Sequence, residues 1–497
     1  MTQGDGGVNA SNPPPQTSVP GRERWFGCER WPRLRYGAQR HGVFLAFLLV
    51  GALLRLVTQV AYRPALLFID SYAYLGNIQR LSPTHIQPVG YAVALRPVLS
   101  LGNLATVAAL QHALGLAMGI TIYAVLVHLG SRRWLAILAA VPVLLDAYQL
   151  QIEQNVLSET VFSALVLGAI VLLLWKNHPT CLALAAAGGL LGLAASVRVV
   201  GLVLVVPAVA FAAVGGPGGW NRLQRAATVA LAFAVPIGVY VGYYRVETGT
   251  VGINRGDANL LYGRAATIVD CHGIDLPAYE RVLCPKEPLG QRLGTDAYAH
   301  HSPYPGRVVV PAGKSRDTVL RDFARRVFAH QPVDLARAVG TDFAKGFTWP
   351  RRTFAGDVPL DWWQFQRHYP TLQRDPVLAI RRQGGGGPDV AAPLAAFLRG
   401  YQRSVGYTPG PLLALAFLAG LAGATGVGRA RRSRLRAACL LPTLSGLMLL
   451  LGADLFLFSW RYQLPALVLA PLGGALGVTA LTAGVPAGTE ATCGVAV

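Results

Sequence analysis

The sequence predicts an all-α membrane protein with about ten transmembrane helices and one soluble domain. Of its 497 residues, 53% are hydrophobic and only 14% are charged, and the mean hydropathy is +0.41. A soluble protein carries roughly 25% charged residues. Apolar runs of bilayer-spanning length recur along the chain, and one long polar segment, 246–409, precedes the last three of them.

Each expected span is an apolar run of about 17 to 25 residues. The runs lie at 43–62, 104–128, 134–150, 156–175, 181–197, 199–215, 226–245, 410–428, 437–458 and 464–483. Arg198 alone separates the fifth run from the sixth, so their boundary is the least marked. The polar residues 146–155 are expected to form a turn between two spans.

Basic residues cluster at alternate ends of these runs, which predicts the orientation of the chain. The clusters are the arginine-rich N-terminal arm, 131–133, 176–178, 221–225 and 429–436. Short basic loops mark the cytoplasmic face of the cell membrane. Both termini are therefore expected on the cytoplasmic side, and 246–409 is expected on the extracytoplasmic side. This distribution also accounts for the net charge of +20 without nucleic-acid binding, because no soluble module carries a basic and aromatic stripe.

The chain therefore divides into five expected regions. They are a disordered basic cytoplasmic arm (1–42), an N-terminal transmembrane module (43–245), an extracytoplasmic domain (246–409), C-terminal transmembrane helices (410–483) and a short cytoplasmic tail (484–497). The extracytoplasmic domain contains two stretches with apolar residues at helical spacing, one capped by Asp317 and one over 335–347. Both are expected to lie along the bilayer surface.

Two of the six cysteines, Cys271 and Cys284, fall in the extracytoplasmic domain. A disulfide between them is expected if that compartment is oxidising. The alternative is a metal site that includes His272, which would offer only three soft ligands.

Several polar residues stand where an apolar environment makes them costly. Asp70 follows the first span, and Glu159 lies one turn inside another. A carboxylate at such a depth needs a partner or a function, and partial desolvation would make Asp70 a better proton acceptor. The alternative for Asp70 is a solvated loop residue or a helix cap near Ser71. Glu153 could replace Glu159, or it could be a solvated loop charge.

Arg198 and Arg461 lie at the expected outer ends of spans, against the positive-inside trend. A guanidinium can bind a phosphate bidentately in a partly dry cleft. The alternative is that each arginine extends to the headgroup layer or pairs with a nearby acid.

Short motifs in a consistent order resemble the GT-C glycosyltransferases that use polyprenyl-phosphate sugars, especially the family 39-like branch with the protein mannosyltransferases and aminoarabinose transferases. The motifs are Asp70-Ser71-Tyr72, the run 85–91, Leu157-Ser158-Glu159, Val197-Arg198 and Arg461-Tyr462-Gln463-Leu464-Pro465. The resemblance implies a GT-C-like helical bundle for most of the chain.

The resemblance also implies roles for residues that match its motifs. Asp70 would be the catalytic base, and His85, Gln87, Arg198, Arg461 and Tyr462 would hold the donor phosphate. Glu159, or Glu153 in its place, would orient the acceptor or hold a divalent cation with Asp70, although such a metal needs several oxygen ligands. The run 87–91 reads Gln-Pro-Val-Gly-Tyr instead of an unbroken Pro-Pro-Gly-Tyr, so the alignment of this motif is shifted.

These observations predict a membrane glycosyltransferase that moves a hexosyl or pentosyl group from a polyprenyl-phosphate donor to a glycan, lipid or protein acceptor. A secondary transporter or flippase is the alternative, but it would favour two repeated halves with broken helices, and no repeat is visible. A non-catalytic envelope scaffold is a third reading. The chain has no Walker-type phosphate loop, and neither Gly-x-Ser-x-Gly nor His-Glu-x-x-His occurs.

Overall fold

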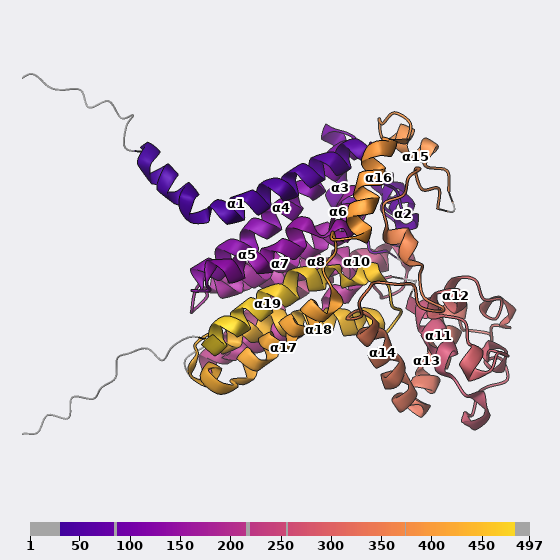
Figure 1. The fold of residues 1–497 in the computed structure, drawn as a ribbon. Coiled ribbons are helices and arrows are strands. Elements are labelled where there is room, and N and C mark those ends of the chain that lie inside the picture. The colour runs from indigo at the N-terminus through magenta and orange to yellow at the C-terminus, as the bar shows by residue number, and fades with distance from the viewer. Residues whose placement is uncertain (1–29, 84–86, 215–218, 255–256, 373, 483–497) are drawn as a thin grey trace, which may run out of the picture. The chain divides into compact units, whose positions relative to one another are not determined.

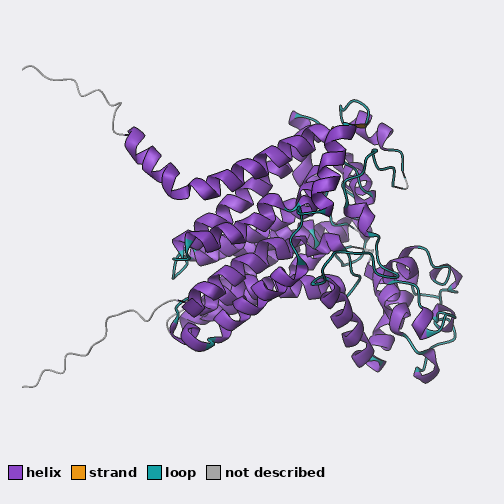
Figure 2. Cartoon of the chain, in the orientation of Figure 1, coloured by secondary structure: helices purple, strands orange, loops and turns teal. Residues whose placement is uncertain are grey.

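The computed structural model describes residues 30–83, 87–214, 219–254, 257–372 and 374–482, and the chain divides into two units, 1–45 and 46–497. The second unit is mostly helical, with its longest loops in segment 246–409 (Figures 1 and 2). In the described part of the chain the strands are β1 (Tyr62–Arg63) and β2 (Asp389–Val390), which pair antiparallel with Tyr62 opposite Val390. The prediction of an all-α fold is confirmed.

Helices cover most of the described residues of each expected span, but the lengths of the helices differ; residues 215 and 483 lie outside the described residues. Among the described residues, five helices are long and apolar enough to cross a membrane, or six if a bent pair is counted as one span. The five are found in α1 (Arg30–Ala61), α4 (Leu104–His128), α10 (Gly219–Thr248), α18 (Arg436–Asp454) and α19 (Leu464–Thr482). The chain is therefore a multi-pass membrane protein.

The remaining expected spans are shorter or broken. The bent pair is α5 (Arg133–Leu145) with α6 (Ala147–Gln154), which meet at 45°. Apolar helices of 10–17 residues cover the other four expected spans. They are α7 (Glu159–Leu174), α8 (Cys181–Val197), the pair η1 (Val199–Leu204) and α9 (Val205–Val214), and α17 (Gly410–Thr425).

Two details of the expected layout are wrong. The helix α1 begins at Arg30, so the expected disordered arm 1–42 is partly helical; residues 1–29 and the tail 484–497 lie outside the described residues. The connection between α1 and α4 also contains two helices, α2 (Ile69–Gln79) and α3 (Gly90–Leu101). The expected turn within 146–155 is mostly the helix α6.

Small residues allow the last helices to pack closely. A Cβ atom added at Gly477 of α19 would lie 2.0 Å from the carbonyl oxygen of Ala419 on α17. A Cβ at Gly474 would meet Ala416 at 2.8 Å. Close backbone approach at small residues is the usual way in which membrane helices gain packing energy.

Segment 246–409 has its own apolar core. Its helices are α11 (Asp257–Ile268), α12 (Thr295–His300), α13 (Arg316–His330), α14 (Pro332–Lys345), α15 (Pro376–Arg382) and α16 (Ala392–Arg403). Short 3-10 turns join them, namely η2 (Cys271–Gly273), η3 (Arg281–Leu283), η4 (Leu289–Gln291), η5 (Pro305–Arg307) and η6 (Leu360–Trp363). Tyr262, Tyr298 and Phe323 are fully buried in the core.

The expectation that α13 lies on the bilayer surface is wrong. Its apolar face, with Val319, Phe323 and Val327, is completely buried in this core. Ser315, not Asp317, caps the helix, because the Ser315 side chain accepts a hydrogen bond from the Thr318 amide. An amphipathic face indicates burial, but it does not say whether lipid or protein covers it.

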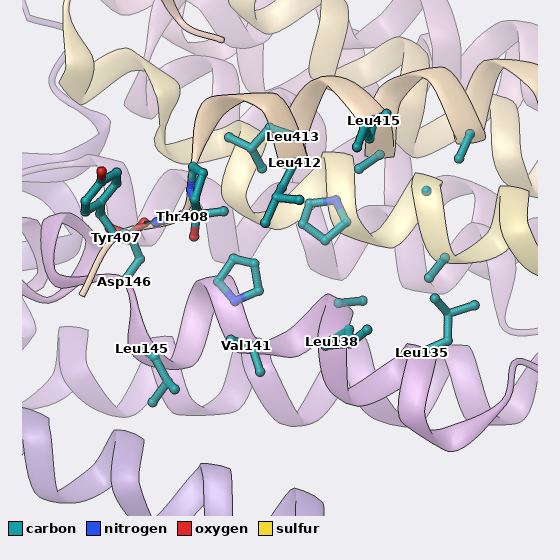
Figure 3. Close-up of a pocket in the computed structure, with 18 of the residues that line it drawn as sticks. Leu135, Leu138, Val141, Leu145, Asp146, Tyr407, Thr408, Leu412, Leu413 and Leu415 are labelled. Carbon is teal, nitrogen blue, oxygen red and sulfur yellow. Dashed lines mark hydrogen bonds between the residues drawn. The ribbon is translucent and has the colours of Figure 1, made fainter. Parts of the chain in front are cut away.

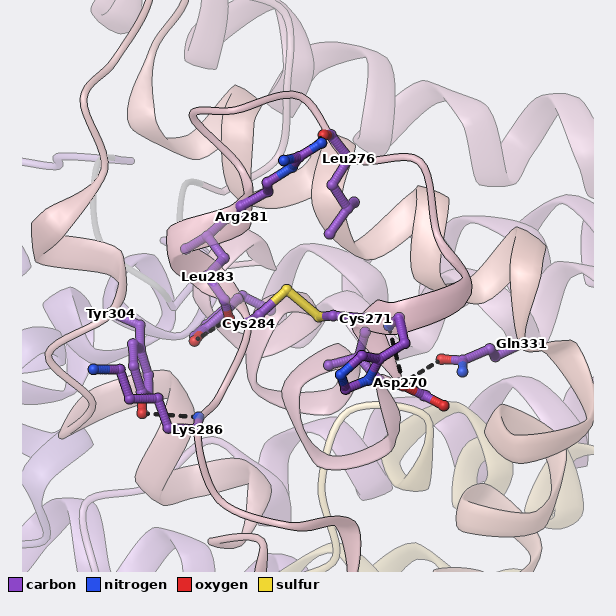
Figure 4. The surroundings of a disulfide bond; sticks show 12 residues. Asp270, Cys271, Leu276, Arg281, Leu283, Cys284, Lys286, Tyr304 and Gln331 are labelled. Atoms are coloured by element: carbon purple, nitrogen blue, oxygen red, sulfur yellow. Dashed lines mark hydrogen bonds and ion pairs between the residues drawn. A yellow bond between two sulfur atoms is a disulfide. The ribbon is translucent and has the colours of Figure 1, made fainter.

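Cys271 and Cys284 form a disulfide bond beside this core (Figure 4). The metal alternative is therefore wrong, because each sulfur is bonded to the other. Asp270 accepts hydrogen bonds from the backbone amide and from Nδ1 of His272, so the acid and the imidazole are paired with each other.

Removing the disulfide is expected to destabilise segment 246–409. The two cysteines are 13 residues apart, and a closed loop of that length contributes about 3 kcal/mol through the unfolded state. The variant Cys271→Ser/Cys284→Ser should therefore show more rapid proteolysis within 246–409. Cys181→Ser is the control, because Cys181 is a free, exposed cysteine. Equal proteolysis of parent and double variant would contradict a stabilising bond.

The buried acid Glu280 predicts a pH dependence for the same segment. Its side chain is fully buried, neither carboxylate oxygen accepts a hydrogen bond among the described residues, and Arg326 lies 3.3 Å away. Burial raises the pKa of Glu280 above its ordinary value and outweighs the opposing effect of Arg326. Because the pKa is higher in the folded state, ionisation of Glu280 lowers the free energy of unfolding as the pH rises through it.

Glu280→Gln is therefore expected to unfold at a higher temperature than the parent at pH 8. The difference should vanish below about pH 4, where the parent carboxyl is protonated. Thermal unfolding of the full-length protein in detergent measures this, with Asp275→Asn, an exposed acid nearby, as the control. A difference that does not change with pH would show that ionisation of Glu280 is not the cause.

Candidate functional site

Asp70, Glu159, Arg198 and Arg461 form one charged cluster, although they come from distant parts of the chain. Arg461 Nη1 lies 2.5 Å from Asp70 Oδ2, and Arg461 Nε donates to Glu159 Oε1. Arg198 Nη1 donates to the same Glu159 oxygen. The side chains of Glu159 and Arg461 are only 2% and 5% exposed, whereas that of Asp70 is 20% exposed. Arg198 is 17% exposed, so solvent reaches the cluster at Asp70 and at Arg198.

Helix ends position these four residues. Asp70 lies in the first turn of α2, and Glu159 is the first residue of α7. Arg198 follows the last residue of α8, and Arg461 lies in the 3-10 turn η8 (Trp460–Gln463). Carboxylates are favoured at helix N-termini and cations at C-termini, so the backbone dipoles support both acids and Arg198.

Hydroxyl groups link the two acid-bearing segments. The Ser71 side chain donates to the carbonyl oxygen of Val156, and Tyr74 Oη lies 3.0 Å from Ser158 Oγ. Burial raises the pKa of Tyr74, and the nearby charges of Asp70 and Glu159 raise it further. Tyr74 is therefore a neutral hydroxyl at working pH, and it serves as a hydrogen-bonding group.

The expected phosphate-binding residues differ in where they lie. Gln87 Nε2 donates to Asp70 Oδ1 at 2.6 Å, so Gln87 is part of the cluster. The Tyr462 ring lies beneath two guanidinium groups, 5.4 Å from Arg198 and 5.8 Å from Arg461. His85 lies outside the described residues.

Aromatic residues that are not among the expected site residues border the cluster. Phe68 and Trp363 each lie 5.5 Å from the Arg461 guanidinium, and their rings are 4.6 Å apart. Trp363 belongs to η6 of segment 246–409, which brings that segment to the site. The two adjacent tryptophans of Asp361-Trp362-Trp363 stand out in the sequence. Trp363 and Arg461 are far apart along the chain, however, so the sequence does not predict their contact.

The cluster also holds polar atoms with no partner among the described residues. Glu159 Oε2, Trp363 Nε1 and Gln463 Oε1 are buried and make no hydrogen bond. Such atoms cost roughly 1–3 kcal/mol each when left unsatisfied. Their concentration beside Arg461 is typical of a site that completes its hydrogen bonds with a ligand.

Glu153 is not part of the cluster. Both its interpretations, as a solvated loop charge and as a replacement for Glu159, are inconsistent with its position. The side chain is completely buried and bonded to Arg55 at 2.8 Å and to His112 at 2.9 Å. Arg55 therefore pairs with a neighbouring helix, because Glu153 belongs to α6.

The residues do not fit a divalent cation. Asp70 and Glu159 are each bonded to a guanidinium, and no group of three His, Cys, Asp or Glu side chains among the described residues could hold a metal ion. No step of the chemistry is therefore assigned to a metal.

A separate cavity of about 500 Å³ lies between α5, α17 and α19 (Figure 3). Its walls are apolar, with Leu138 on α5 and Leu412 on α17, and Asp146 at one end is its charged lining residue. Asp146 is already bonded to the Thr408 amide and to Arg351. None of the four cluster residues lines this cavity, so it is not the site of the charged chemistry.

Two solved structures of glycosyltransferases resemble the chain. Archaeal oligosaccharyltransferase AglB from Archaeoglobus fulgidus, in complex with an inhibitory peptide and a dolichol-phosphate, matches with a TM-score of 0.41 and 13% identity, over 89% of this chain and 50% of that one. The S. cerevisiae protein O-mannosyltransferase Pmt1-Pmt2 complex bound to the sugar donor matches with a TM-score of 0.34 and 15% identity, over 48% and 37%.

This chain spans half or less of the length of both structures. No protein-family model matches the sequence, and no curated protein sequence matches it significantly. The chemistry of the site is assigned from the charged cluster itself.

Proposed function

We propose that the protein is an integral membrane glycosyltransferase that moves one sugar from a polyprenyl-phosphate donor to an acceptor at the extracytoplasmic face of the cell membrane. The observation that carries the proposal is the cluster of two acids and two arginines in a membrane protein, with Glu159 and Arg461 buried. Charged groups at such positions are costly and are usually retained for function.

Asp70 is the proposed base because it is the most accessible member of the cluster. It would take the proton from the acceptor hydroxyl while that oxygen attacks the anomeric carbon. The bond between the anomeric carbon and the phosphate oxygen breaks in the same step, and the electron pair leaves with the polyprenyl phosphate. Single displacement of this kind inverts the anomeric configuration.

The arginines would stabilise the phosphate as it leaves. The cluster is charge-balanced without a ligand, since two carboxylates face two guanidinium groups. A donor phosphate adds negative charge and competes with Asp70 for Arg461. Movement of Arg461 toward the phosphate would release Asp70 to accept a proton, which couples donor binding to activation of the base. His85 and Gln87 are the further proposed phosphate ligands.

The proposal is tested with the full-length protein in liposomes. Isotope-labelled polyprenyl-phosphate hexoses and pentoses are supplied with an envelope extract as the acceptor, and mass spectrometry follows the labelled sugar. Transfer with release of polyprenyl phosphate supports the proposal. Movement of the intact donor across the bilayer without transfer would instead support a flippase. A comparison of envelope glycans from cells with and without the gene identifies the natural acceptor.

A further inference from the structure

Helix α6 is unusually polar for a helix that is buried along its whole length. All eight of its residues, Ala-Tyr-Gln-Leu-Gln-Ile-Glu-Gln, are buried. A hydrogen-bonded network around Glu153 offsets much of this cost, although Gln151 Oε1 has no partner among the described residues. The helix leads directly through 155–158 to Glu159 of the charged cluster. Buried polar networks are stabilising only when their members are satisfied.

Glu153 has three partners. Its Oε1 accepts hydrogen bonds from Arg55 Nη2 at 2.8 Å and from Gln149 Nε2 at 3.0 Å. Its Oε2 lies 2.9 Å from His112 Nδ1. The other ring nitrogen, His112 Nε2, lies 2.8 Å from Gln154 Oε1. Arg55 is further held by the carbonyl oxygens of Val143 and Leu144.

The orientation of Gln154 determines where the protons are. Gln154 Nε2 donates to the carbonyl oxygen of Tyr62 at 2.6 Å, so the amide oxygen must face His112. His112 Nε2 therefore carries a hydrogen. A second proton must then lie between His112 Nδ1 and Glu153 Oε2, because two bare acceptors would repel each other at 2.9 Å. Whichever atom holds it, the group of Arg55, Glu153 and His112 carries one net positive charge.

The same network joins the two segments that carry the acids of the cluster. Beyond the bond from Gln154 to Tyr62, the Leu66 amide donates to the Gln154 carbonyl oxygen at 2.9 Å, and the Val156 amide donates to the Leu66 carbonyl oxygen at 3.0 Å. Ser71 adds a bond to the carbonyl oxygen of Val156. We call these four bonds the backbone clamp. It ends one residue from Asp70 and three residues from Glu159.

We infer that Glu153, His112 and Gln154 are positioning residues. Through the shared proton and the backbone clamp, they hold Asp70 and Glu159 at the spacing that Arg461 bridges. The inference rests on the proposed transferase function for its kinetic consequences. It assigns Glu153 no contact with substrate. A displacement of about 1 Å in a reacting group can cost on the order of 100-fold in rate, so a loosened clamp should lower kcat.

The first test compares two matched substitutions on α6. Gln154→Met removes the links to His112 and Tyr62, whereas Gln149→Met removes only a bond to Glu153. Both glutamines are buried, so the change in size and polarity is the same. Gln154→Met is expected to lower kcat by about 10- to 100-fold with little change in the donor KM, and Gln149→Met should lower it by about twofold or less. Equal losses in the two variants would overturn the positioning role.

The second test uses the shared proton. In Glu153→Gln, the new amide can donate to His112 Nδ1 while its oxygen still accepts from Arg55 and Gln149. The neutral imidazole remains satisfied, and the net charge of the group stays the same. Glu153→Gln should therefore retain kcat within about threefold. Glu153→Ala should not, because it removes the partner of His112 Nδ1 and leaves Arg55 with only backbone carbonyl partners among the described residues. Loss of transfer in Glu153→Gln comparable to that in Asp70→Asn would show that Glu153 reacts with substrate.

Amide hydrogen exchange of the full-length protein separates this inference from the proposed function. Peptides covering 62–71 and 154–158 should exchange faster in Gln154→Met than in the parent, and no faster in Gln149→Met. This result does not depend on sugar transfer, so it holds even if no polyprenyl-phosphate sugar is a substrate. Unchanged exchange in Gln154→Met would overturn the clamp.

Discussion

Asp70→Asn is expected to reduce sugar transfer by about 10²- to 10⁴-fold while the protein remains folded and inserted in the membrane. The asparagine keeps the shape of the side chain. Its oxygen can accept from Arg461, and its NH2 group can donate to Gln87 if the Gln87 amide turns to present its oxygen. It cannot accept the acceptor proton, so the loss should appear in kcat. The measurement is the liposome transfer assay with labelled donor, accompanied by thermal unfolding of the same preparation.

The matched control for this substitution is Asp389→Asn. Asp389 is also paired with an arginine, Arg63, but 55% of its side chain is exposed and it lies outside the charged cluster. Its replacement should leave transfer unchanged. Full transfer activity in Asp70→Asn would contradict the role of Asp70 as the base. A loss of activity in both variants would indicate a general effect of removing an acid.

Arg461→Met is expected to have the largest effect on both stability and activity. Arg461 neutralises two carboxylates. Among the described residues, its removal leaves Asp70 without a paired cation and Glu159 with Arg198 alone. Breaking a buried ion pair by deleting one partner typically costs about 3–5 kcal/mol. Transfer should fall below detection, and thermal unfolding in detergent should occur at a clearly lower temperature.

Arg461→Lys separates the two effects of that substitution. A lysine restores the charge but cannot bridge two acids or a phosphate with a planar fork of donors. This variant should regain most of the stability and still bind the donor weakly, which would appear as a raised donor KM. Arg63→Met is the control, because an exposed ion pair contributes only about 0–1 kcal/mol. Wild-type kinetics in Arg461→Lys would contradict a phosphate-binding role.

The sequence was sufficient to predict the helical class, the segments that lie in the apolar bundle and the residues of the charged cluster. These predictions depend on local chemistry: a run of apolar residues must leave water, and an acid or arginine beside such a run needs a partner. Cys271 and Cys284 were paired for a similar local reason, because they are neighbours in one polar segment.

The sequence could not predict which helices are long enough to cross the bilayer or what covers an amphipathic face. The residues of α13 have the pattern of a surface helix, yet they form the core of segment 246–409 because tertiary contacts offered a better apolar environment than lipid. The sequence of α6 resembles a polar turn. It folds as a buried helix in which Arg55 of α1 and His112 of α4 bond to its one acid, Glu153.

The sequence by itself determined that this is a membrane protein with acids and arginines at costly positions beside the ends of its spans. Only the tertiary structure decided how those charges combine. It joined Asp70, Glu159, Arg198 and Arg461 in one cluster, excluded Glu153 from it and brought Trp363 to its edge. The physical reason is that the cost of burying a charge is a property of the residue and its local sequence, whereas its compensation depends on partners up to 391 positions away along the chain.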